Sequence, residues 1–438
     1  IAAAVEAAKN AKNGKPQLII AKTVIGKGIP GIEGTTKGHG EGGAKLQEEA
    51  HANWGIPAGE RYYVSEDVRA AFSDLKAQRE KDFNAWNAMY EQWRRTYPEL
   101  AEELDAGINA CSCGVNPADS DKAIPPFPQD YSDATRSAGA VAINAIAKAN
   151  PCFLTTSADL YSSNKNYLSG AGDFSAETPE GRNFWFGIRE HAMAAICNGI
   201  KLHGGLEVFC STFFVFSDYM RNAMRMSALM NLNVIYVLTH DSIGVGEDGP
   251  THQPVEHLAS LRAIPNMNVF RPADAGETTA AYVTALRSKC PTCIVCSRQN
   301  LPQLDANAKL ALRGGYIVSD VKKPDVILMA SGSEVSLALE AKKILEGEGV
   351  EVRVVSMPCM ELYDKQSKAY KESVMPSNCT KRVAIEAGVS MPWMKYVGLE
   401  GATVCMDTFG ESGKPSDLFA HFGFTAENVA QKARELLK

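Results

Sequence analysis

The chain has 438 residues, of which 45% are hydrophobic and 22% are charged, and its formal net charge at pH 7 is -6. These values predict a globular protein of roughly two to four domains and exclude the strongly basic charge that draws proteins to nucleic acid. No apolar run approaches the roughly 18 residues of a membrane-spanning helix. The eleven scattered cysteines favour reduced thiols and a cytoplasmic location.

The chain opens with the helical pattern IAAAVEAAKN, followed by a turn that contains glycine and by a predicted strand at Gln17–Thr23. A helix that leads into a strand is the second half of a βαβ unit. A strand without neighbours leaves backbone donors and acceptors unpaired. We therefore expect further residues to precede this segment in the natural protein.

Three segments that differ in composition and periodicity follow. Residues 24–48 form a glycine-rich loop, residues 65–105 have a charged helical pattern, and residues 106–132 mix Cys, Pro, Asp and Ser without a period. The helical segment is predicted to carry aromatic residues near one face, namely Trp86, Tyr90 and Trp93. The aperiodic segment is predicted to be a linker.

From residue 133 to about residue 311, short apolar runs alternate with helical ones. The runs predicted as strands are CFLTTS, LEVFCSTF, NVIYVL, NVFRP and CIVCSR. This alternation predicts an α/β fold, in which helices on both faces cover a parallel sheet. From residue 312 a smaller α/β domain is expected, with strands at Asp325–Ala330 and Glu351–Met357 and a helix between them that ends near Leu345.

The stretch THDSIGVGEDGPTHQP, residues 239–254, directly follows the run NVIYVL. Open α/β sheets bind ligands at the carboxyl ends of their strands. Glycines let a backbone turn tightly and approach a ligand. The stretch is therefore a candidate active-site loop, on which His240, Asp248 and His252 converge, although polar loops also occur without a function.

The run CPTCIVC, residues 290–296, has the spacing of a zinc or iron–sulfur site. No fourth ligand is nearby, and strand residues alternate between two faces. We therefore interpret Cys290, Cys293 and Cys296 as plain thiols.

Several long motifs occur in one order along the chain: TSADLYSSN (156–164), FGIREHAM (186–193), STFFVFSDYMRNAMRMSAL (211–229), the loop at 239–254, SRQNLPQL (297–304) and DTFGESGKPSDLF (407–419). Together they resemble the transketolases, which use thiamine diphosphate. The resemblance runs from Lys22 to the C-terminus and implies the thiamine-diphosphate-binding fold with a smaller C-terminal α/β domain. It also implies transfer of a two-carbon ketol unit from a ketose phosphate to an aldose phosphate, as in the pentose phosphate pathway or the Calvin cycle.

The resemblance implies that a carboxyl group and an aromatic slot bind the aminopyrimidine of the cofactor. Glu190 matches the glutamate that hydrogen-bonds the pyrimidine ring and favours its reactive tautomer. Phe213, Phe216 and Tyr219 match the aromatic pocket, and their spacing predicts that one helical turn presents all three. Asp159 matches an aspartate near the cofactor; pairing of Glu190 with Arg189 and a strand-end cap at Asp159 are the structural alternatives.

Substrate residues are implied in the same way. Arg136, Ser163, His240 and Arg298 match positions that bind the sugar phosphate, for which arginine forks are well suited. Asp248 matches the aspartate that reads the C2 hydroxyl of the donor sugar. His252 and His39 match histidines near the C1 hydroxyl and the reacting carbonyl, where an imidazole can shuttle protons.

One departure from the family concerns the metal. Transketolases hold the diphosphate and a Mg or Ca ion through a Gly-Asp-Gly motif and a downstream asparagine, and no such unit precedes Lys22. We therefore assign no metal ligand in this chain, and we expect these ligands in an absent N-terminal part. Within the matching region, Thr36 replaces a histidine of the family.

The expected organisation has four parts. Residues 1–50 are a remnant of the diphosphate-binding domain, 51–132 a helical segment and linker, 133–311 the pyrimidine-binding domain and 312–438 the C-terminal α/β domain. The resemblance implies a homodimer with active sites at the subunit interface, acting on sugar phosphates, without nucleic-acid or membrane partners. Two alternatives are a related 1-deoxyxylulose-phosphate synthase and a catalytically silent truncated subunit; the loop GEDGPTHQP favours transketolase over the former.

Overall fold

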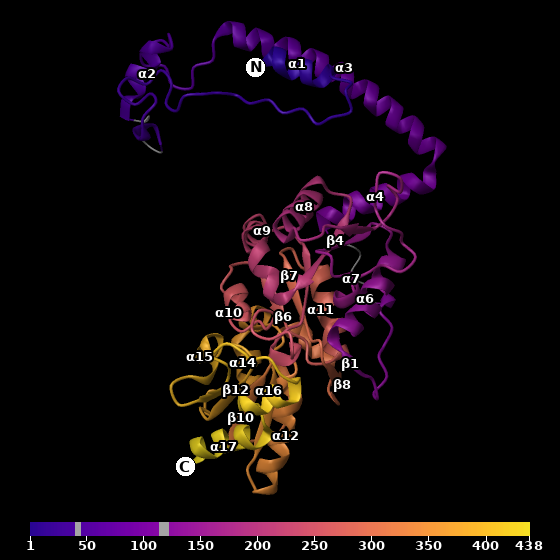
Figure 1. The fold of residues 1–438 in the computed structure, drawn as a ribbon, viewed down its shortest axis with the longest axis vertical. Helices are drawn as coiled ribbons and strands as arrows, with labels where there is room; N and C mark the ends of the chain where they lie inside the picture. Colours follow the sequence, from indigo (N-terminus) through magenta and orange to yellow (C-terminus); the bar gives the residue numbers. More distant parts are fainter. Residues whose placement is uncertain (40–44, 114–121) are drawn as a thin grey trace. The chain divides into compact units, whose positions relative to one another are not determined.

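The computed structural model describes residues 1–39, 45–113 and 122–438. They form two compact units, Ile1–Tyr97 and Pro98–Lys438. The coloured ribbons of Figure 1 follow both units along the chain. Each unit is described by itself.

The first unit is helical. Its elements are α1 (Ala2–Asn10), η1 (Thr36–Gly38), α2 (Gln47–Asn53) and α3 (Glu66–Thr96). The predicted aromatic face of α3 is confirmed, because the Trp86 and Tyr90 rings stack at 4.9 Å and the Tyr90 and Trp93 rings at 5.7 Å between centroids.

The predicted strand at Gln17–Thr23 is wrong. The segment has no regular secondary structure, and Leu18 and Ile20 are 84% and 76% exposed. A strand exists only through backbone pairing with a neighbour. None of the residues that the structure describes supplies that neighbour. The segment therefore does not form a strand, although its composition favours one.

A six-stranded parallel sheet forms the centre of the second unit, which confirms the predicted α/β architecture. Its strand order is β3-β2-β4-β5-β7-β6. The strands are β2 (Phe153–Ser157), β3 (Asn183–Trp185), β4 (Glu207–Phe213), β5 (Ile235–Thr239), β6 (Asn268–Phe270) and β7 (Thr292–Cys296).

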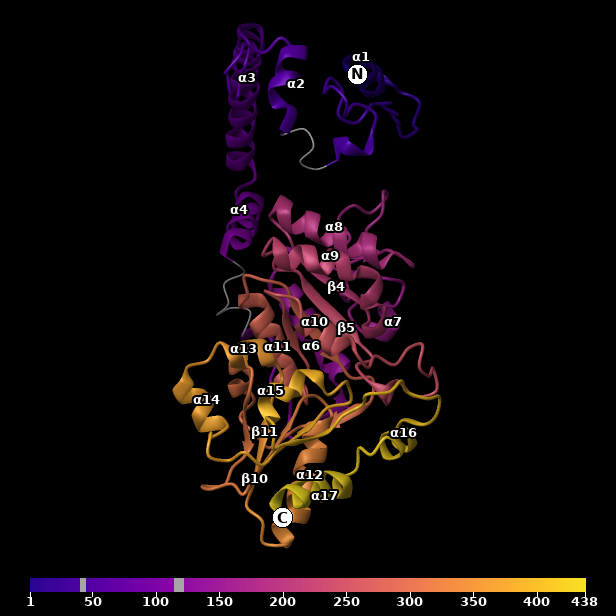
Figure 2. The ribbon, with the colours of Figure 1, turned by 90° about the vertical axis from the view of Figure 1, so that its left-hand side faces the viewer.

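Both faces of this sheet are buried. On β5, Ile235 and Val237 enter one core, whereas Tyr236 and Leu238 enter the core on the opposite face. Strands buried on both sides read as continuous apolar runs, which is why NVIYVL shows no alternation. The helices that cover the sheet include α6 (Thr135–Ala149), α8 (Glu190–His203), α9 (Ser217–Leu229) and α11 (Ala275–Arg287), with α8 and α9 side by side (Figure 2).

The C-terminal domain has a five-stranded sheet of order β13-β12-β10-β11-β9, in which only the edge strand β9 is antiparallel. Helices α12 and α17 pack together over one face of this sheet (Figure 1). Its strands are β9 (Tyr316–Ser319), β10 (Val326–Ala330), β11 (Val352–Ser356), β12 (Arg382–Ile385) and β13 (Ala402–Val404). Its longer helices are α12 (Glu334–Gly347) and α17 (Ala426–Leu437).

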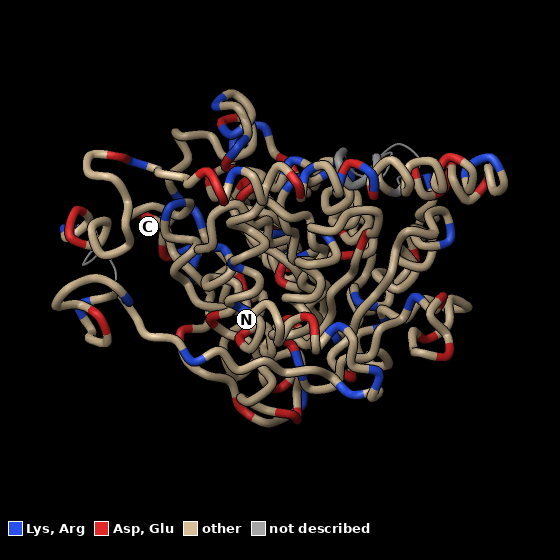
Figure 3. The backbone as a smooth tube through the Cα atoms, turned by 90° about the horizontal axis from the view of Figure 1, so that it is seen from above, with Lys and Arg blue, Asp and Glu red and all other residues tan. Residues whose placement is uncertain are grey.

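The remaining elements are short or peripheral. They are α4 (Pro98–Cys113), β1 (Ser132–Ala134), α7 (Tyr161–Asn164), η3 (Phe214–Phe216), η4 (Ile243–Val245), α10 (His257–Arg262), β8 (Asn300–Pro302), η5 (Ala308–Arg313), α13 (Met360–Asp364), α14 (Lys368–Val374), η6 (Met391–Trp393), α15 (Met394–Val397) and α16 (Pro415–His421). Along the backbone, acidic and basic residues are interspersed (Figure 3). Among the helices of the described residues, none is long and apolar enough to cross a bilayer.

Candidate active site

The loop that follows β5 begins with a strained and buried residue. His240 has a φ of 65°, in the left-handed region, and is 3% exposed. A non-glycine residue in this region costs on the order of 1–3 kcal/mol and persists only where its surroundings fix it, which happens most often at functional sites. Gly246 and Gly249 take positive φ values further along the same loop.

Hydrogen bonds fix the ring of His240. The Thr239 hydroxyl donates to Asn164 Oδ1 at 2.7 Å, so its oxygen accepts from His240 Nδ1, which lies 2.8 Å away. The lone pair is therefore on Nε2, 3.4 Å from Nη1 of Arg136. Burial, with the charges of Arg136, Arg298 and His252, lowers the pKa of His240 to about 3. The imidazole is neutral at neutral pH and accepts from the arginine.

Arg136 lies in the first turn of α6, beside this imidazole. Its Nη1 donates to the carbonyl of Ser163 at 2.7 Å, and its buried Nε has no partner among the described residues. Burial lowers the pKa of the guanidinium, and Arg298 adds like-charge repulsion. The resemblance implies that Ser163 binds the sugar phosphate; in the structure, the backbone carbonyl of Ser163 accepts from Arg136.

Arg298 follows β7 and is exposed. Within the described part of the chain, its guanidinium has no hydrogen bond or ion pair, whereas it acts on the pKa values of both Arg136 and His240. Two cations near one neutral imidazole form a site of positive potential, which the charge of Asp133 offsets only in part. Such a site fits a phosphate, which an arginine fork can bind through two hydrogen bonds.

An aromatic group borders this cationic site. The rings of Phe213 and Phe216 stack with centroids 5.8 Å apart and an interplanar angle of 12°. The ring of His240 lies 3.8 Å from that of Phe213, and the ring of His252 lies 5.4 Å from that of Phe216. Tyr219 follows at 6.0 Å from Phe216 and is 66% exposed. A flat apolar ring fits such a surface.

The prediction that one helical turn presents these three aromatic residues is wrong in its geometry. Phe213 is the last residue of β4, Phe216 ends the 3₁₀ turn η3, and only Tyr219 lies in α9. The rings nevertheless follow one another, because the chain changes from strand to helix within a few residues.

Glu190 is the first residue of α8 and is 6% exposed. No hydrogen bond or ion pair from any described residue reaches its carboxylate. The alternative pairing with Arg189 does not occur, since Arg189 donates to the Phe186 carbonyl at 2.5 Å. A buried carboxylate without a partner is costly, so Glu190 is a candidate to bind a ligand donor.

Of the other predicted residues, Asp159, Asp248 and His39 take no part in the contacts described above, whereas the ring of His252 lies beside that of Phe216. Asp159 is exposed with a φ of 61°, just beyond the carboxyl end of β2, and Asp248 is exposed in the loop after β5. His252 bonds Thr251 Oγ1 through Nδ1 at 2.9 Å. His39 is exposed in the first unit.

The three cysteines of CPTCIVC have separate surroundings. Cys290 contacts Ser288, Cys293 lies in the core on one face of the sheet, and Cys296 lies in the core on the other. Burial raises the pKa of Cys293 well above its usual value and that of Cys296 to about 12. These thiols do not converge on a metal, as strand alternation predicted.

The residues that hold the site's side chains in place were not predicted from the sequence. Thr239 and Asn164 fix the tautomer of His240, and a buried ion pair joins the adjacent Asp241 to Arg271. Thr239 and Asn164 lie inside the motifs that resemble the family, and that position was the only indication in the sequence that they support the site. Nothing in the sequence pairs Asp241 with Arg271.

Comparisons with family descriptions cover most of the chain. Residues 1–111 match "Transketolase, thiamine diphosphate binding domain", residues 132–303 match "Transketolase, pyrimidine binding domain", and residues 314–425 match "Transketolase-like TK C-terminal domain".

Individual proteins that are similar to this chain are also named transketolases. The transketolase of Dictyostelium discoideum is 46% identical over 98% of this chain, and the chain spans 64% of that protein's length. The chloroplastic transketolase of Craterostigma plantagineum is 47% identical over 100% of this chain, and 85% of that protein is covered.

Solved structures are similar as well. A transketolase from Leishmania mexicana superposes with a TM-score of 0.90 at 39% identity, over 100% of this chain and 64% of that one. A transketolase from Pichia stipitis in complex with sedoheptulose-7-phosphate has a TM-score of 0.91 at 38% identity, with 100% and 64% covered. A third structure is described as a split-gene transketolase, an inactive β4 tetramer; its TM-score is 0.57 at 29% identity, over 70% of this chain and 98% of that one.

Proposed function

Since the chain belongs to the transketolase family, we propose that the protein transfers a two-carbon ketol unit from a ketose phosphate to an aldose phosphate. The observation that carries the proposal is the meeting of Arg136, His240 and the stacked Phe213 and Phe216 rings at the carboxyl edge of the sheet. A phosphate site beside a slot for a flat ring suits a sugar phosphate and an aminopyrimidine.

Thiamine diphosphate is the proposed cofactor. Two features support the fit of its pyrimidine: the aromatic surface of Phe213 and Phe216, with Tyr219 beside it, and the buried carboxyl group of Glu190, which has no partner among the described residues. The bound cofactor supplies a carbanion at its thiazolium ring. The role of Glu190 is to share a proton with the pyrimidine nitrogen, and Asp159 is proposed to lie near the same group.

The divalent metal, Mg or Ca, is proposed to be held by residues other than the cofactor and substrate residues named in this chain. One group of described residues has the spacing of a metal site, Asp218, Glu256 and His257, and their ligand atoms lie within 4.8 Å of one another. His257 already bonds Asp218 at 3.1 Å, and no residue of the group belongs to the phosphate or aromatic surfaces. We therefore derive no step of the reaction through a metal.

Substrate residues are assigned by position and charge. Arg136, His240 and Arg298 are proposed to bind the substrate phosphate, with Ser163 holding Arg136. Asp248 is proposed to read the C2 hydroxyl of the donor. His252 and His39 are proposed to move protons at the C1 hydroxyl and the reacting carbonyl, a role for which a titrating imidazole is suited.

A homodimer is the proposed assembly, with a site that both subunits complete. Supporting it, the β3–α8–α9 region exposes several large apolar side chains: Trp185, Ile188, Ile196, Leu202, Tyr219 and Leu229. Ile188, which is 89% exposed, lies two residues before Glu190. Large exposed apolar patches mark association surfaces.

A second candidate function is that of a catalytically silent subunit. The similarity to the inactive split-gene tetramer favours it, because this chain covers 98% of that protein. We also propose a cytoplasmic location and the four-part organisation 1–50, 51–132, 133–311 and 312–438. The nine cysteines from Cys152 to Cys405 are free thiols, which supports a reducing compartment.

One experiment separates the two candidates. The full-length protein, supplied with thiamine diphosphate and magnesium, is assayed for transfer between a pentulose phosphate and an aldose phosphate, and its mass is measured in solution. Turnover by a dimer supports transketolase activity. A stable assembly that binds sugar phosphate but turns nothing over would support the silent subunit instead.

A further inference from the structure

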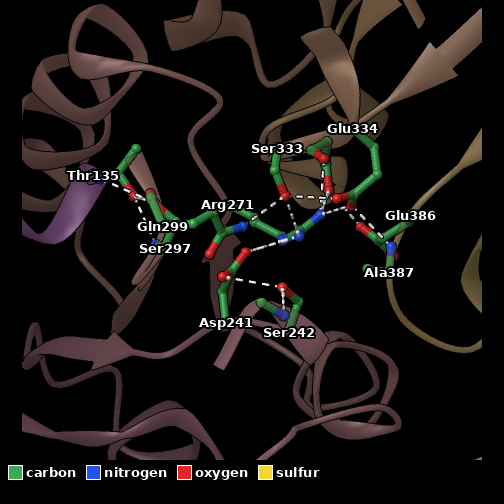
Figure 4. A network of polar contacts seen from close by, with 12 residues as sticks. Thr135, Asp241, Ser242, Arg271, Ser297, Gln299, Ser333, Glu334, Glu386 and Ala387 are labelled. Carbon is green, nitrogen blue, oxygen red and sulfur yellow. Dashed lines mark hydrogen bonds and ion pairs between the residues drawn. The ribbon is translucent and has the colours of Figure 1, made fainter. Parts of the chain in front are cut away.

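A buried polar network joins the loop after β5 to the C-terminal domain (Figure 4). Its centre is Arg271, which follows β6 and is 0% exposed. Arg271 Nε donates to Asp241 Oδ2 at 3.0 Å, and Nη1 donates to the Ser331 carbonyl at 2.8 Å and to Glu334 Oε2 at 2.5 Å. One guanidinium thus joins the site loop to the C-terminal domain.

The charge balance shows that this junction is tightly held. Burial opposes the charged form of Arg271, yet Glu334 and Asp241 outweigh it and raise its pKa. Asp241 is 2% and Glu334 1% exposed. A buried charge of this kind is tolerated only where its partners are in good geometry, so small displacements of either side are costly. Glu334 is fixed in turn, since it accepts from the Ala387 amide at 2.8 Å.

The turn Ser331–Glu334 is shaped around this guanidinium. Gly332 has a φ of 58°, and a Cβ at this position would lie 2.6 Å from Arg271 Cζ. Only glycine combines this backbone conformation with such a close approach. The sequence SGSE, residues 331–334, therefore encloses an arginine of the neighbouring domain.

Each proposed phosphate-binding side chain is adjacent in sequence to a member of this network. His240 precedes Asp241. Arg298 stands between Ser297 and Gln299, whose Nε2 donates to Ser333 Oγ at 3.2 Å. Arg136 follows Thr135, whose amide donates to Ser297 Oγ at 3.0 Å and whose Oγ1 accepts from the Ser297 amide at 2.7 Å.

The anchor at Asp241 also bears on the strain at His240. On its N-terminal side the residue is held through Thr239 and Asn164. On its C-terminal side the next residue is bonded to Arg271. A left-handed non-glycine residue persists only where its surroundings fix it, and bonds on both sides of His240 do so.

We propose that the turn Ser331–Glu334 of the C-terminal domain positions His240 and Arg298, through Arg271 and Gln299, and so sets the affinity for the substrate's phosphate. The inference rests on the proposed function, since it takes these two side chains to bind phosphate. Arg271, Gln299 and Ser333 act in this proposal as positioning residues, through the bonds that they make to other side chains.

The test uses Gly332→Ala, which displaces Arg271, and Ser333→Ala, which removes the acceptor of Gln299. Each has a matched control in the same domain. Gly349→Ala places a side chain at a φ of 86° with no atom of the described residues within 4 Å, and Ser336→Ala removes a buried hydroxyl that has no partner among those residues. The full-length protein with thiamine diphosphate and magnesium is measured with a phosphorylated and an unphosphorylated ketol donor, and with inorganic phosphate as inhibitor.

We expect both test variants to raise the KM for the phosphorylated donor and the inhibition constant of phosphate by about tenfold, the scale on which packed networks modulate a distant site. The kcat and KM for the unphosphorylated donor should change less than about twofold, and the controls should resemble the wild type. Equal losses on both donors, or none on either, would overturn the proposal, since a merely destabilised domain lowers the active fraction for every substrate.

If the wild type turns over no sugar phosphate, the proposed function fails while the positioning role remains testable. Calorimetric titration with inorganic phosphate then gives the same comparison without catalysis. Weaker binding by Gly332→Ala and Ser333→Ala, but not by their controls, supports the role. Equal binding by all five proteins, or none by the wild type, refutes it.

Discussion

Replacing Arg298 by alanine separates phosphate binding from every other function of the site. Arg298 is exposed and has no partner in the described part of the chain, so its removal leaves no buried group without its bond. A hydrogen bond to a charged group contributes about 1.5–3 kcal/mol. The KM for a phosphorylated donor should therefore rise about 10- to 150-fold, whereas an unphosphorylated ketol should be affected little.

The same substitution changes the titration of His240. Burial is the largest cause of its low pKa of about 3, and the charge of Arg298 is among the others. Removal of that positive charge favours the imidazolium, so the pKa of His240 should rise in the Arg298→Ala protein. A ¹⁵N NMR titration of the histidine side chains measures this shift.

Arg434→Ala serves as the control for both measurements. Arg434 is a surface arginine paired with Glu348 at 2.6 Å, and such pairs contribute about 0–1 kcal/mol. If Arg298→Ala weakened both donors equally, or left the titration of His240 unchanged, Arg298 would not belong to the phosphate site.

The remaining predictions concern the cofactor site and two buried titrating groups. Glu190→Gln should lower kcat at saturating cofactor by at least about a hundredfold without changing the circular dichroism spectrum, because the amide cannot share a proton with the pyrimidine; a near-normal rate would exclude this role. Phe216→Ala should weaken thiamine diphosphate binding by about 1–3 kcal/mol in calorimetry, with Phe419→Ala as control. Binding of a phosphate dianion should raise the pKa of His240, so that calorimetry in buffers of different ionisation enthalpy detects proton uptake below neutral pH; uptake that persists in His240→Asn would refute the assignment. Burial, and then the charge of Asp274, raises the pKa of Glu277 from 4.5 to about 7. The folded state then holds a proton that the unfolded state has lost, so this stabilisation is complete below the unfolded pKa and is lost as the pH rises through about 7. The free energy of unfolding should fall by an amount on the order of 3 kcal/mol between pH 5 and pH 8, and Glu277→Gln should remove most of that slope.

The sequence alone predicted five of the six strands of the central sheet, all except β3, and the position of the candidate active-site loop after β5. Apolar runs such as NVIYVL and CIVCSR are short, rich in β-branched residues and bounded by polar turns, and each became a buried parallel strand. Parallel strands place their carboxyl ends at one edge of the sheet. For that reason the loop after β5, which was predicted to lie at the carboxyl end of its strand, shares one edge of the sheet with the residues that follow β2 and β7.

Local pattern was insufficient where secondary structure depends on a neighbour. Gln17–Thr23 has the composition of a strand, but pairing decides a strand, and no described residue pairs with it. The spacing of Phe213, Phe216 and Tyr219 fits a helix, yet Phe213 closes β4 because the chain must first complete its pairing with β5. Periodicity indicates which residues share a face, but it does not indicate where a strand ends and the following helix begins.

Only the tertiary structure decided the chemical state of the site. The neutral imidazole of His240 depends on its burial and on the charges of Arg136, in the first turn of α6, and Arg298, which follows β7. The partnership of Arg271 with Asp241 and Glu334 joins positions 30 and 63 residues apart. Desolvation and Coulomb energy depend on distance in space and on the surrounding dielectric, and sequence separation carries neither quantity.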